Sequence, residues 1–299
     1  MPERITVEVD GRRLTLSHLD KPLWPEFTKG EALDYYARVA DALLPHTRNR
    51  AASFVRFPEG VAGERFYAKN PPGGTPPWVR RVDVPSKSEG TKAHVSVDDR
   101  PSLMALANLY CLEIHVPQWN GTDGAELHDR LVVDLDPGEG ADLTDCCRVA
   151  LLIREALAAD GLDCVPVTSG SKGLHLYAPL LPSPAEAVLD YARRMAERLA
   201  IAHPKQVVAR MTKALRPGKV FVDWSQNNTA KTTSTPYTLR ATSPAPGVST
   251  PVTWDEVAAC TDPAQLAFGP DEVLDRIAAS GDLALDLLDP TAATVIPVD

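Results

Sequence analysis

Alternating and helical patterns of apolar residues predict a strand-rich beginning to the chain. Residues 5–16 alternate apolar and polar side chains around an Asp10-Gly11 turn, which predicts a β-hairpin. An apolar stripe at helical spacing predicts a helix over residues 31–44 that ends at Pro45. Short apolar runs at 53–57, 65–68 and 94–97 lie among segments rich in Pro and Gly, which predicts a strand-and-loop layer. Residues 83–93 are predicted to be a loop that is mobile or binds a partner.

From about residue 101 onward, helices and strands mix. The patterns predict helices over 102–110, 143–159 and 184–199, strands over 113–116, 131–135, 164–168, 174–178 and 220–222, and two short acidic helices within 253–289. Neighbouring strands joined by tight turns must be antiparallel, so we expect an α+β fold with an RRM-like antiparallel sheet. We expect a single domain over 1–299. Its predicted parts are a smaller N-terminal strand-and-loop subdomain (1–100), an RRM-like core (101–240) and acidic C-terminal helices (241–299), with 241–251 as a linker.

Composition is that of a globular protein that can bury a core. Of the 299 residues, 44% are hydrophobic and 24% are charged, and no apolar run approaches the roughly 18 residues of a membrane span. The first residues do not follow the pattern of a signal peptide, so we expect a soluble cytoplasmic protein with no membrane contact. The five cysteines are odd in number and never take C-x-x-C spacing, which favours buried free thiols over disulfides or a zinc site.

The distribution of charge changes the meaning of the formal net charge of −9. Residues 241–299 carry ten acids and one base, so the remainder of the chain is balanced. Within that remainder, 205–240 holds seven bases and one acid, and 46–92 holds nine bases and four acids. Two basic segments of this kind are either solvated faces or the walls of one groove that binds phosphates, and the motifs below favour the groove.

Two carboxylates end an apolar strand in Leu131-Val-Val-Asp134-Leu-Asp136. Residues i and i+2 of a strand project to the same face, so Asp134 and Asp136 are predicted to point together, away from the apolar side chains. Paired carboxylates repel each other unless a cation neutralises them, and Mg²⁺ or Mn²⁺ prefers oxygen ligands. The pair therefore indicates a metal site, although exposed strand ends often carry Asp for other reasons.

Three further features carry candidate chemistry. The segment Val167-Thr-Ser-Gly-Ser-Lys-Gly-Leu-His-Leu-Tyr177 reads as strand, glycine turn and strand, and it offers hydroxyls, a lysine and a histidine to a polyphosphate, without the Walker spacing. Asp223 follows an apolar strand within the most basic stretch and is either a salt-bridge partner or a third metal ligand. His115 ends another strand, where a lone histidine is usually structural.

These motifs, in this order, resemble the archaeo-eukaryotic primase superfamily, and within it the polymerase domain of bacterial ligase D and its stand-alone relatives. The likeness runs from about residue 14 to 280 and is carried by LEIHVPQW, DLDPGEG, VTSGSKGLHLY, MTKALRPGKVFVDWSQN and PYTLR. It implies a primase-type RRM-like catalytic core and a template-dependent DNA/RNA nucleotidyltransferase that adds nucleotides, preferably ribonucleotides, to a primer 3′-hydroxyl. It also implies work at gaps or double-strand breaks in DNA repair, association with the nucleoid, and end-joining or ligase partners.

The resemblance implies a role for each matching residue. Two Mn²⁺ or Mg²⁺ ions would be bound by Asp134, Asp136 and Asp223. The incoming nucleotide would be bound by His115, Ser169, Lys172, His175, Arg216, Gln226 and Arg240. DNA, including a downstream 5′-phosphate, would be bound by His18, Lys21, Lys29, Phe66, Tyr67, Lys69 and Lys213.

The chain departs from the ligase D pattern at two places. His18 stands where the 5′-phosphate pocket has an Asn, and the second lysine of the pocket, Lys29, follows Lys21 across a shorter loop. Val55, with Arg56 beside it, stands where the pattern has a lysine that contacts the triphosphate. These differences favour a stand-alone relative with its own task.

Several functions stay open at this point. A primase would start chains without a primer, and a gap filler in excision repair would not need broken ends. A DNA-end or single-strand-binding module would bind without catalysis, and a phosphohydrolase would turn over nucleotides without a template.

Overall fold

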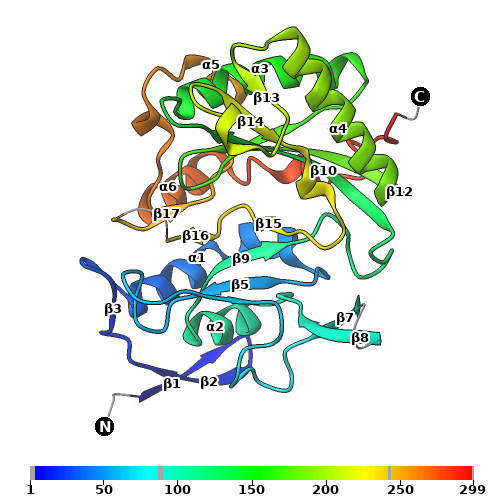
Figure 1. Cartoon of the computed structure of the whole chain (residues 1–299). Helices are drawn as coiled ribbons and strands as arrows, with labels where there is room; N and C mark the ends of the chain where they lie inside the picture. The colour runs from blue at the N-terminus through cyan, green and yellow to red at the C-terminus, as the bar shows by residue number, and fades with distance from the viewer. Residues whose placement is uncertain (1–3, 87–89, 242–243, 298–299) are drawn as a thin grey trace. The chain divides into compact units, whose positions relative to one another are not determined.

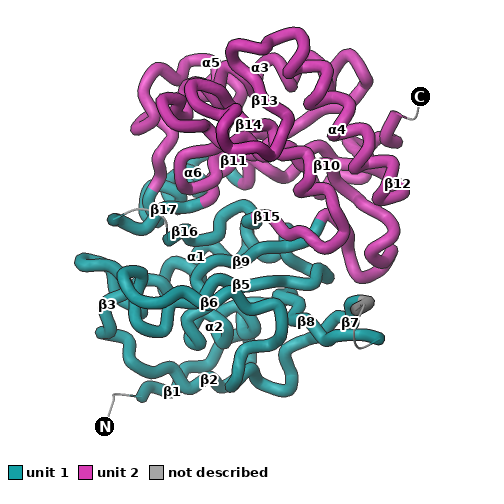
Figure 2. The backbone as a smooth tube through the Cα atoms, viewed as in Figure 1, with its two compact units in different colours: residues 1–117, 234–248, 269–281 teal, residues 118–233, 249–268, 282–299 magenta. Residues whose placement is uncertain are grey.

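The computed structural model describes residues 4–86, 90–241 and 244–297. The chain forms two compact units, each built from several segments (Figure 2). Unit 1 comprises 1–117, 234–248 and 269–281, and unit 2 comprises 118–233, 249–268 and 282–299. No helix of the described residues combines the length and hydrophobicity that a membrane span requires.

Unit 1 combines hairpins with a small sheet and three helices (Figure 1). Its strands are β1 (Arg4–Val9), β2 (Arg12–Ser17), β3 (Pro22–Trp24), β4 (Phe27–Thr28), β5 (Ser53–Arg56), β6 (Phe66–Ala68), β7 (Arg81–Ser86), β8 (Gly90–Val95), β9 (Cys111–Val116), β16 (Leu239–Arg240) and β17 (Gly247–Val248). Its helices are α1 (Lys29–Thr47), α2 (Arg100–Asn108) and α6 (Pro270–Ser280). The sheet has the order β15-β9-β5-β6, where β15 (Thr233–Ser234) lies at the point where the chain re-enters this unit.

Unit 2 is built on a five-stranded sheet with the order β11-β12-β10-β14-β13. The strands are β10 (Leu127–Pro137), β11 (Val165–Thr168), β12 (Leu174–Pro184), β13 (Val207–Val208) and β14 (Val220–Asp223). The α-helices are α3 (Leu143–Ala159), α4 (Ala185–Ala202) and α5 (Trp254–Ala259), and the short 3-10 helices are η1 (Lys213–Leu215), η2 (Trp224–Asn227), η3 (Pro263–Leu266) and η4 (Leu285–Leu288). All strand pairs of this sheet are antiparallel except β13 with β14, which confirms the predicted α+β class.

The core of unit 2 lies on one face of this sheet. Leu131, Val133 and Leu135 of β10 are fully buried and belong to one apolar cluster with side chains of α3 and α4. Val132 faces the other way and packs with Tyr177 in a smaller cluster that includes residues of η4. The predicted alternation of β10 is therefore confirmed. It leaves the face opposite α3 and α4 for the polar ends of the strands.

The predicted N-terminal hairpin and first helix are confirmed, although the helix is longer than expected. Asp10 and Gly11 both have positive φ, as a two-residue hairpin turn requires. Thr28 and Glu31 form a capping box, which starts α1 at Lys29. Pro45 lies inside α1 and does not end it. The last turn continues to Thr47, whose hydroxyl donates to the carbonyl oxygens of Leu44 and Val97.

Two segments that were predicted to be loose contain regular structure. The predicted loop at 83–93 lies within the β7–β8 hairpin, in which Arg81 pairs with Val95; residues 87–89 lie outside the described residues. The chain passes from unit 1 to unit 2 within the predicted linker at 241–251, between residues 248 and 249, but the segment also contains β17 and the buried Ser249 and Thr250; residues 242–243 are not described.

The two units divide the chain differently from the predicted segments. β9 pairs with β5, so the first unit extends to residue 117 instead of 100. The residues after 240 are shared between both units and do not form a separate layer.

Candidate active site

The carboxylates of Asp134, Asp136 and Asp223 come to one face of the unit 2 sheet. Asp134 pairs with Asp223 of β14 in the antiparallel register, and Asp136 pairs with Phe221. Opposite residues of antiparallel strands project to the same face, as do i and i+2. On the other side of β10, Asp134 pairs with His175 of β12, whose Nε2 lies 3.4 Å from Asp134 Oδ1. Strand register thus gathers residues that are 89 positions apart.

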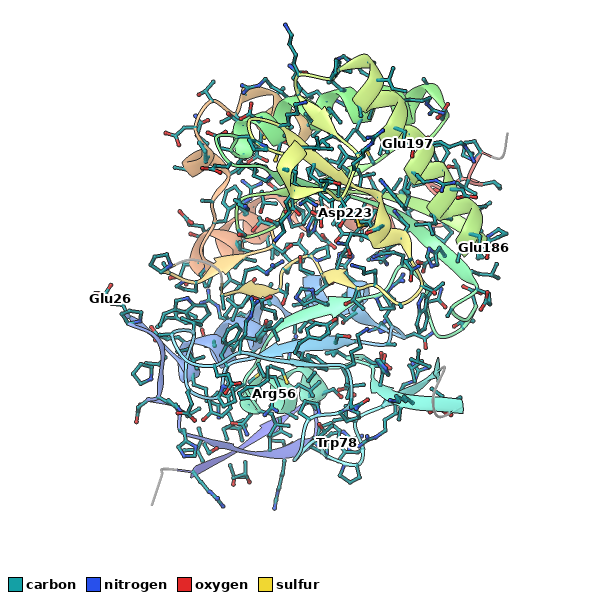
Figure 3. The ribbon with its side chains drawn as sticks, viewed as in Figure 1. Glu26, Arg56, Trp78, Glu186, Glu197 and Asp223 are labelled. Atoms are coloured by element: carbon teal, nitrogen blue, oxygen red, sulfur yellow. The ribbon has the colours of Figure 1, made fainter. Side chains whose placement is uncertain are left out.

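Asp223 is the most enclosed of the three carboxylates, at 9% exposure. Its Oδ1 accepts hydrogen bonds from the Ser225 hydroxyl (2.6 Å) and backbone N–H (3.0 Å), and its Oδ2 accepts one from Gln226 Nε2 (2.9 Å). These bonds begin η2 and hold the carboxylate at the strand end, where Figure 3 labels Asp223. Gln226, a predicted nucleotide contact, is therefore bonded to a predicted metal ligand.

The electrostatics of this face favour a cation. Burial raises the pKa of Asp136, the Asp134 charge raises it further, His175 lowers it, Asp223 raises it and Lys172 lowers it, and the result is a pKa of about 6. A carboxyl group that resists ionisation beside two other carboxylates is in excess negative potential.

The side chains are not arranged as a finished metal site. Among the described residues, no group of three or more His, Cys, Asp or Glu side chains is placed to hold a metal ion. Both oxygens of the Asp223 carboxylate accept hydrogen bonds from protein donors, Ser225 and Gln226. The donor set itself fits Mg²⁺ or Mn²⁺, because it consists of carboxylate oxygens on one face.

The predicted polyphosphate cradle forms a tight turn between β11 and β12. Gly170 has a φ of 65°, and the Ser169 hydroxyl oxygen accepts the N–H groups of Ser171 (3.3 Å) and Gly173 (3.0 Å). A Cβ on Gly173 would lie 2.3 Å from the Leu135 carbonyl oxygen, so only glycine allows this turn to approach β10. Lys172 Nζ lies 3.4 Å from the Pro137 carbonyl oxygen, at the carboxylate end of β10.

Arg216 reaches the same end of β10 from the basic loop. A Cβ on Gly138 would lie 2.0 Å from the Arg216 carbonyl oxygen, and Gly138 N–H donates to the Lys219 carbonyl oxygen at 2.8 Å. The Arg216 guanidinium lies 3.7 Å from the centre of the Phe221 ring, and Phe221 is the register partner of Asp136. Lys172 therefore acts electrostatically on Asp136, and Arg216 stacks on the ring of the residue that pairs with Asp136. Lys213, in η1, is exposed.

His115 and Arg240 lie in unit 1, and the structure joins them through Glu113. Glu113 Oε2 lies 3.1 Å from His115 Nε2 and 3.3 Å from Arg240 Nε. The predicted nucleotide-binding residues thus form two groups, one in each unit.

Phe66 and Tyr67, which were predicted to stack on template bases, are both exposed to solvent, as that role requires. Phe66 and Tyr67 are 43% and 54% exposed, although large aromatic side chains are usually buried. The Tyr67 ring lies edge-on to His115, with 6.5 Å between ring centres. Lys69 follows and is exposed. The basic segments at 46–92 and 205–233 fall in different units, so the predicted groove stays a prediction.

His18, Lys21 and Lys29 come together around a compact loop. Lys21 N–H donates to the His18 carbonyl oxygen and Lys29 N–H to that of Lys21. The Lys21 and Lys29 ammonium groups lie 5.5 Å and 4.4 Å from the centre of the Tyr110 ring. The structure brings the three predicted residues into one cluster.

Lys29 differs from its neighbours because it is 1% exposed. Its Nζ donates to the Ser17 carbonyl oxygen (2.6 Å) and to Asn108 Oδ1 (2.8 Å). Burial, and then the charge of Lys21, lower its pKa to about 8. In this conformation its ammonium is enclosed by protein acceptors, whereas His18 is exposed and Lys21 is partly exposed.

Sequence reasoning missed three residues that hold the site. Asn227 is fully buried, and its carboxamide pairs with both the N–H (2.9 Å) and the C=O (2.7 Å) of Val132 on β10. Ser225 holds Asp223, and Glu113 holds His115. The sequence signal for Asn227 and Ser225 was the polar run that follows Asp223. Glu113 lies in the motif LEIHVPQW, but no role was predicted for it.

Comparisons with known proteins agree with this geometry. A family model described as LigD, primase-polymerase domain, matches residues 28–284. The chain is 44% identical over 279 residues to the multifunctional non-homologous end joining protein LigD of Mycolicibacterium smegmatis, covering 92% of this chain and 36% of that protein. It is 45% identical over 291 residues to the LigD of Mycobacterium tuberculosis, covering 94% and 38%. Against the bifunctional LigD of Bacillus subtilis the identity is 31% over 273 residues, covering 90% and 43%.

A solved structure gives the same result for the fold. The polymerase domain from Mycobacterium tuberculosis ligase D, in complex with DNA, matches with a TM-score of 0.85 and 44% identity, over 92% of this chain and 98% of that one. The chain spans well under half the length of the curated relatives it matches, from 29% to 43%. The predicted resemblance and fold class are confirmed. The chain belongs to the LigD primase-polymerase domain family, a family of nucleotidyltransferases.

Proposed function

We propose that this chain is a template-dependent polymerase that adds nucleotides, preferably ribonucleotides, to a primer 3′-hydroxyl at gaps or double-strand-break ends. Its place would be non-homologous end joining at the nucleoid, beside end-joining or ligase partners. The observation that carries the proposal is the register of β10 with β14, which aligns Asp134, Asp136 and Asp223 on one face. The relatives are named as non-homologous end joining proteins, which supports the pathway.

The residues of unit 2 would divide the work of phosphoryl transfer. Asp134, Asp136 and Asp223 would hold two Mn²⁺ or Mg²⁺ ions, which when bound supply the positive charge that stabilises the entering and leaving oxygens. Lys172 and Arg216 reach the carboxylate end of β10, so they would bind the triphosphate. Catalysis of this kind is positioning and charge neutralisation, with no covalent enzyme intermediate.

The neighbouring residues would keep these groups in place. His175 pairs with Asp134 and would fix its orientation. Ser169 closes the turn that presents Lys172. His115 and Arg240 are proposed to contact the nucleotide on the strength of the sequence resemblance alone.

At the DNA, His18, Lys21 and Lys29 are proposed to recognise a downstream 5′-phosphate, and Phe66 and Tyr67 to stack on template bases beside Lys69 and Lys213. The exposure of both aromatic rings and the meeting of two lysines over Tyr110 support these roles.

The test is extension of a labelled primer by the wild-type chain and by Asp134→Ala/Asp136→Ala, on gapped, overhanging and unprimed templates. The reactions contain ribo- or deoxyribonucleotides, with Mg²⁺ or Mn²⁺. We expect the double variant to lose extension and to keep primer-template binding. Asp190→Ala is the matched control, because it removes an exposed carboxylate of the same unit that only pairs with Arg193. Extension by the double variant at the wild-type rate would overturn the proposal.

The same assay separates the alternatives. Synthesis on unprimed templates would identify a primase, and nucleotide turnover without template a phosphohydrolase. Lys21→Ala should remove the preference for a 5′-phosphate over a 5′-hydroxyl on the downstream strand. If the wild type shows that preference and Lys21→Ala retains it, the assigned pocket is wrong.

A further inference from the structure

Glu113 is a buried carboxylate whose contacts link two proposed nucleotide-binding residues. It lies in the middle of β9 and is 4% exposed. Its Oε2 is shared between His115 Nε2 (3.1 Å) and Arg240 Nε (3.3 Å), and its Oε1 accepts the N–H of Ala241 at 2.9 Å. One side chain thus fastens the end of β9 to β16, which comes from more than 120 positions later in the chain.

The charge of Glu113 is stabilised by these partners. Burial by itself raises the pKa of Glu113, but the His115 hydrogen bond, the charges of Arg240 and His115 and the Ala241 N–H lower it to about 2. The carboxylate is therefore ionised at every pH at which the protein would work. Arg240 Nε is buried and makes no hydrogen bond, so its contact with Glu113 is an ion pair. A buried carboxylate with three partners fixes their positions relative to one another.

The residue that pairs with Glu113 on the neighbouring strand β5 is uncharged. Val55 of β5 is the register partner of Glu113 on one side and of Tyr67 on the other. Valine carries no charge, so the carboxylate of Glu113 is held by His115, Arg240 and the N–H of Ala241.

We propose that Glu113 is a positioning residue that sets His115 and Arg240 for a bound nucleotide, an inference that rests on the proposed function. Glu113 does not itself touch the nucleotide. It orients one imidazole and one guanidinium, and both groups lose a fixed acceptor when the carboxylate is removed.

The experiment measures nucleotide KM and kcat for gap filling by the wild type, Glu113→Gln and Glu113→Asp. Gln keeps the volume and removes the charge, whereas Asp keeps the charge and withdraws it from both partners by one methylene. We expect either variant to raise the nucleotide KM about 10-fold and to change kcat less than about 3-fold, because binding and not chemistry is affected. Asp34→Asn is the matched control, since Asp34 is an exposed carboxylate of the same unit paired with Arg38; its KM should equal that of the wild type.

A second background distinguishes positioning from general support of the fold. In His115→Ala/Arg240→Ala protein, the added Glu113→Gln change should alter the nucleotide KM less than about 2-fold, because coupled residues are not additive. If Glu113→Gln raises the nucleotide KM of the double variant as much as it raises that of the wild type, the inference is overturned. If Glu113→Gln does not fold, Glu113→Asp decides, and an unchanged KM in either folded variant also overturns it. Absence of extension by the wild type and Asp34→Asn would instead overturn the proposed function, and the positioning role with it.

Discussion

Removing the charge of Asp136 should stabilise the metal-free protein at neutral pH. The pKa of Asp136 is about 6 in the folded protein, against its ordinary value of 3.8 in the unfolded chain. The folded state holds the proton of Asp136 more tightly than the unfolded chain does. The contribution of this group to the free energy of unfolding is therefore fully present below about pH 4 and is lost as the pH rises through 6. Asp136→Asn abolishes the titration and should recover this loss.

The magnitude follows from the shift. About two pKa units at 1.36 kcal/mol each give an upper bound of ~3 kcal/mol. Asp136 is partly exposed to solvent, which screens the interaction, so we expect about 1–2 kcal/mol. For a chain of this size that corresponds to a rise in melting temperature of roughly 2–6 °C.

The assay is thermal unfolding with a chelator present, between pH 4 and pH 8. The wild type and Asp136→Asn should melt together at the acidic end and separate above pH 6. Asp190→Asn, the exposed control on α4, should show no such separation. In excess Mn²⁺ the order should reverse, because a ligand stabilises the state that binds it, by about 2.7 kcal/mol at 100 times its dissociation constant. A gap that is independent of pH, or a less stable Asp136→Asn at pH 8, refutes the reasoning.

Three further changes test other parts of the site. Gly138→Ala should displace the loop of Arg216 and raise the nucleotide KM about 10-fold or more. Its control is Gly140→Ala, because a Cβ there meets no neighbouring atom. The positive φ of Gly140 should cost only roughly 1–2 kcal/mol of unfolding free energy. Asn227→Ala removes two buried hydrogen bonds to β10 and should lower unfolding free energy by about 2–4 kcal/mol in denaturant titrations, and a loss below 1 kcal/mol would contradict the assigned role. Val55→Lys restores the charge of the ligase D pattern and should lower the nucleotide KM about 3- to 10-fold; an increase would show that this site needs an uncharged side chain there.

The alternation of side chains along one strand was enough to predict that Asp134 and Asp136 share a face of the sheet. The pairing of distant strands determines which other residues lie on that face. Asp134 and Asp136 could be placed together from the sequence, because side chains two apart in a strand point the same way. The pairing of Asp134 with Asp223 joins positions 89 apart, and no local pattern specifies that register. The same holds for Asn227, whose bonds to Val132 are visible only after β10 and η2 are packed.

The errors also have a physical cause. Pro and Gly between residues 83 and 93 suggested a loop, yet four cross-strand pairs of the β7–β8 hairpin lie there. The segment at 241–251 looked like a linker because it is rich in small and turn-forming residues. Val248 instead pairs with Leu239, and Ser249 donates to the Thr168 carbonyl oxygen. Tertiary pairing outweighed the local preferences in both places.

The pKa values of Glu113 and Asp136 are shifted in opposite directions, and the difference bears on the roles proposed for the two carboxylates. Glu113 has protein partners of opposite charge, its pKa falls to about 2, and its negative charge is used to hold His115 and Arg240. Burial, together with the charges of Asp134 and Asp223, raises the pKa of Asp136 to about 6, and the nearby His175 and Lys172 do not compensate. A carboxylate whose charge is already balanced by protein cations attracts a metal ion weakly. A carboxylate in a negative electrostatic potential is stabilised when a metal ion binds. The opposite directions of the two shifts support the proposals that Glu113 positions its neighbours and that Asp136 binds the metals.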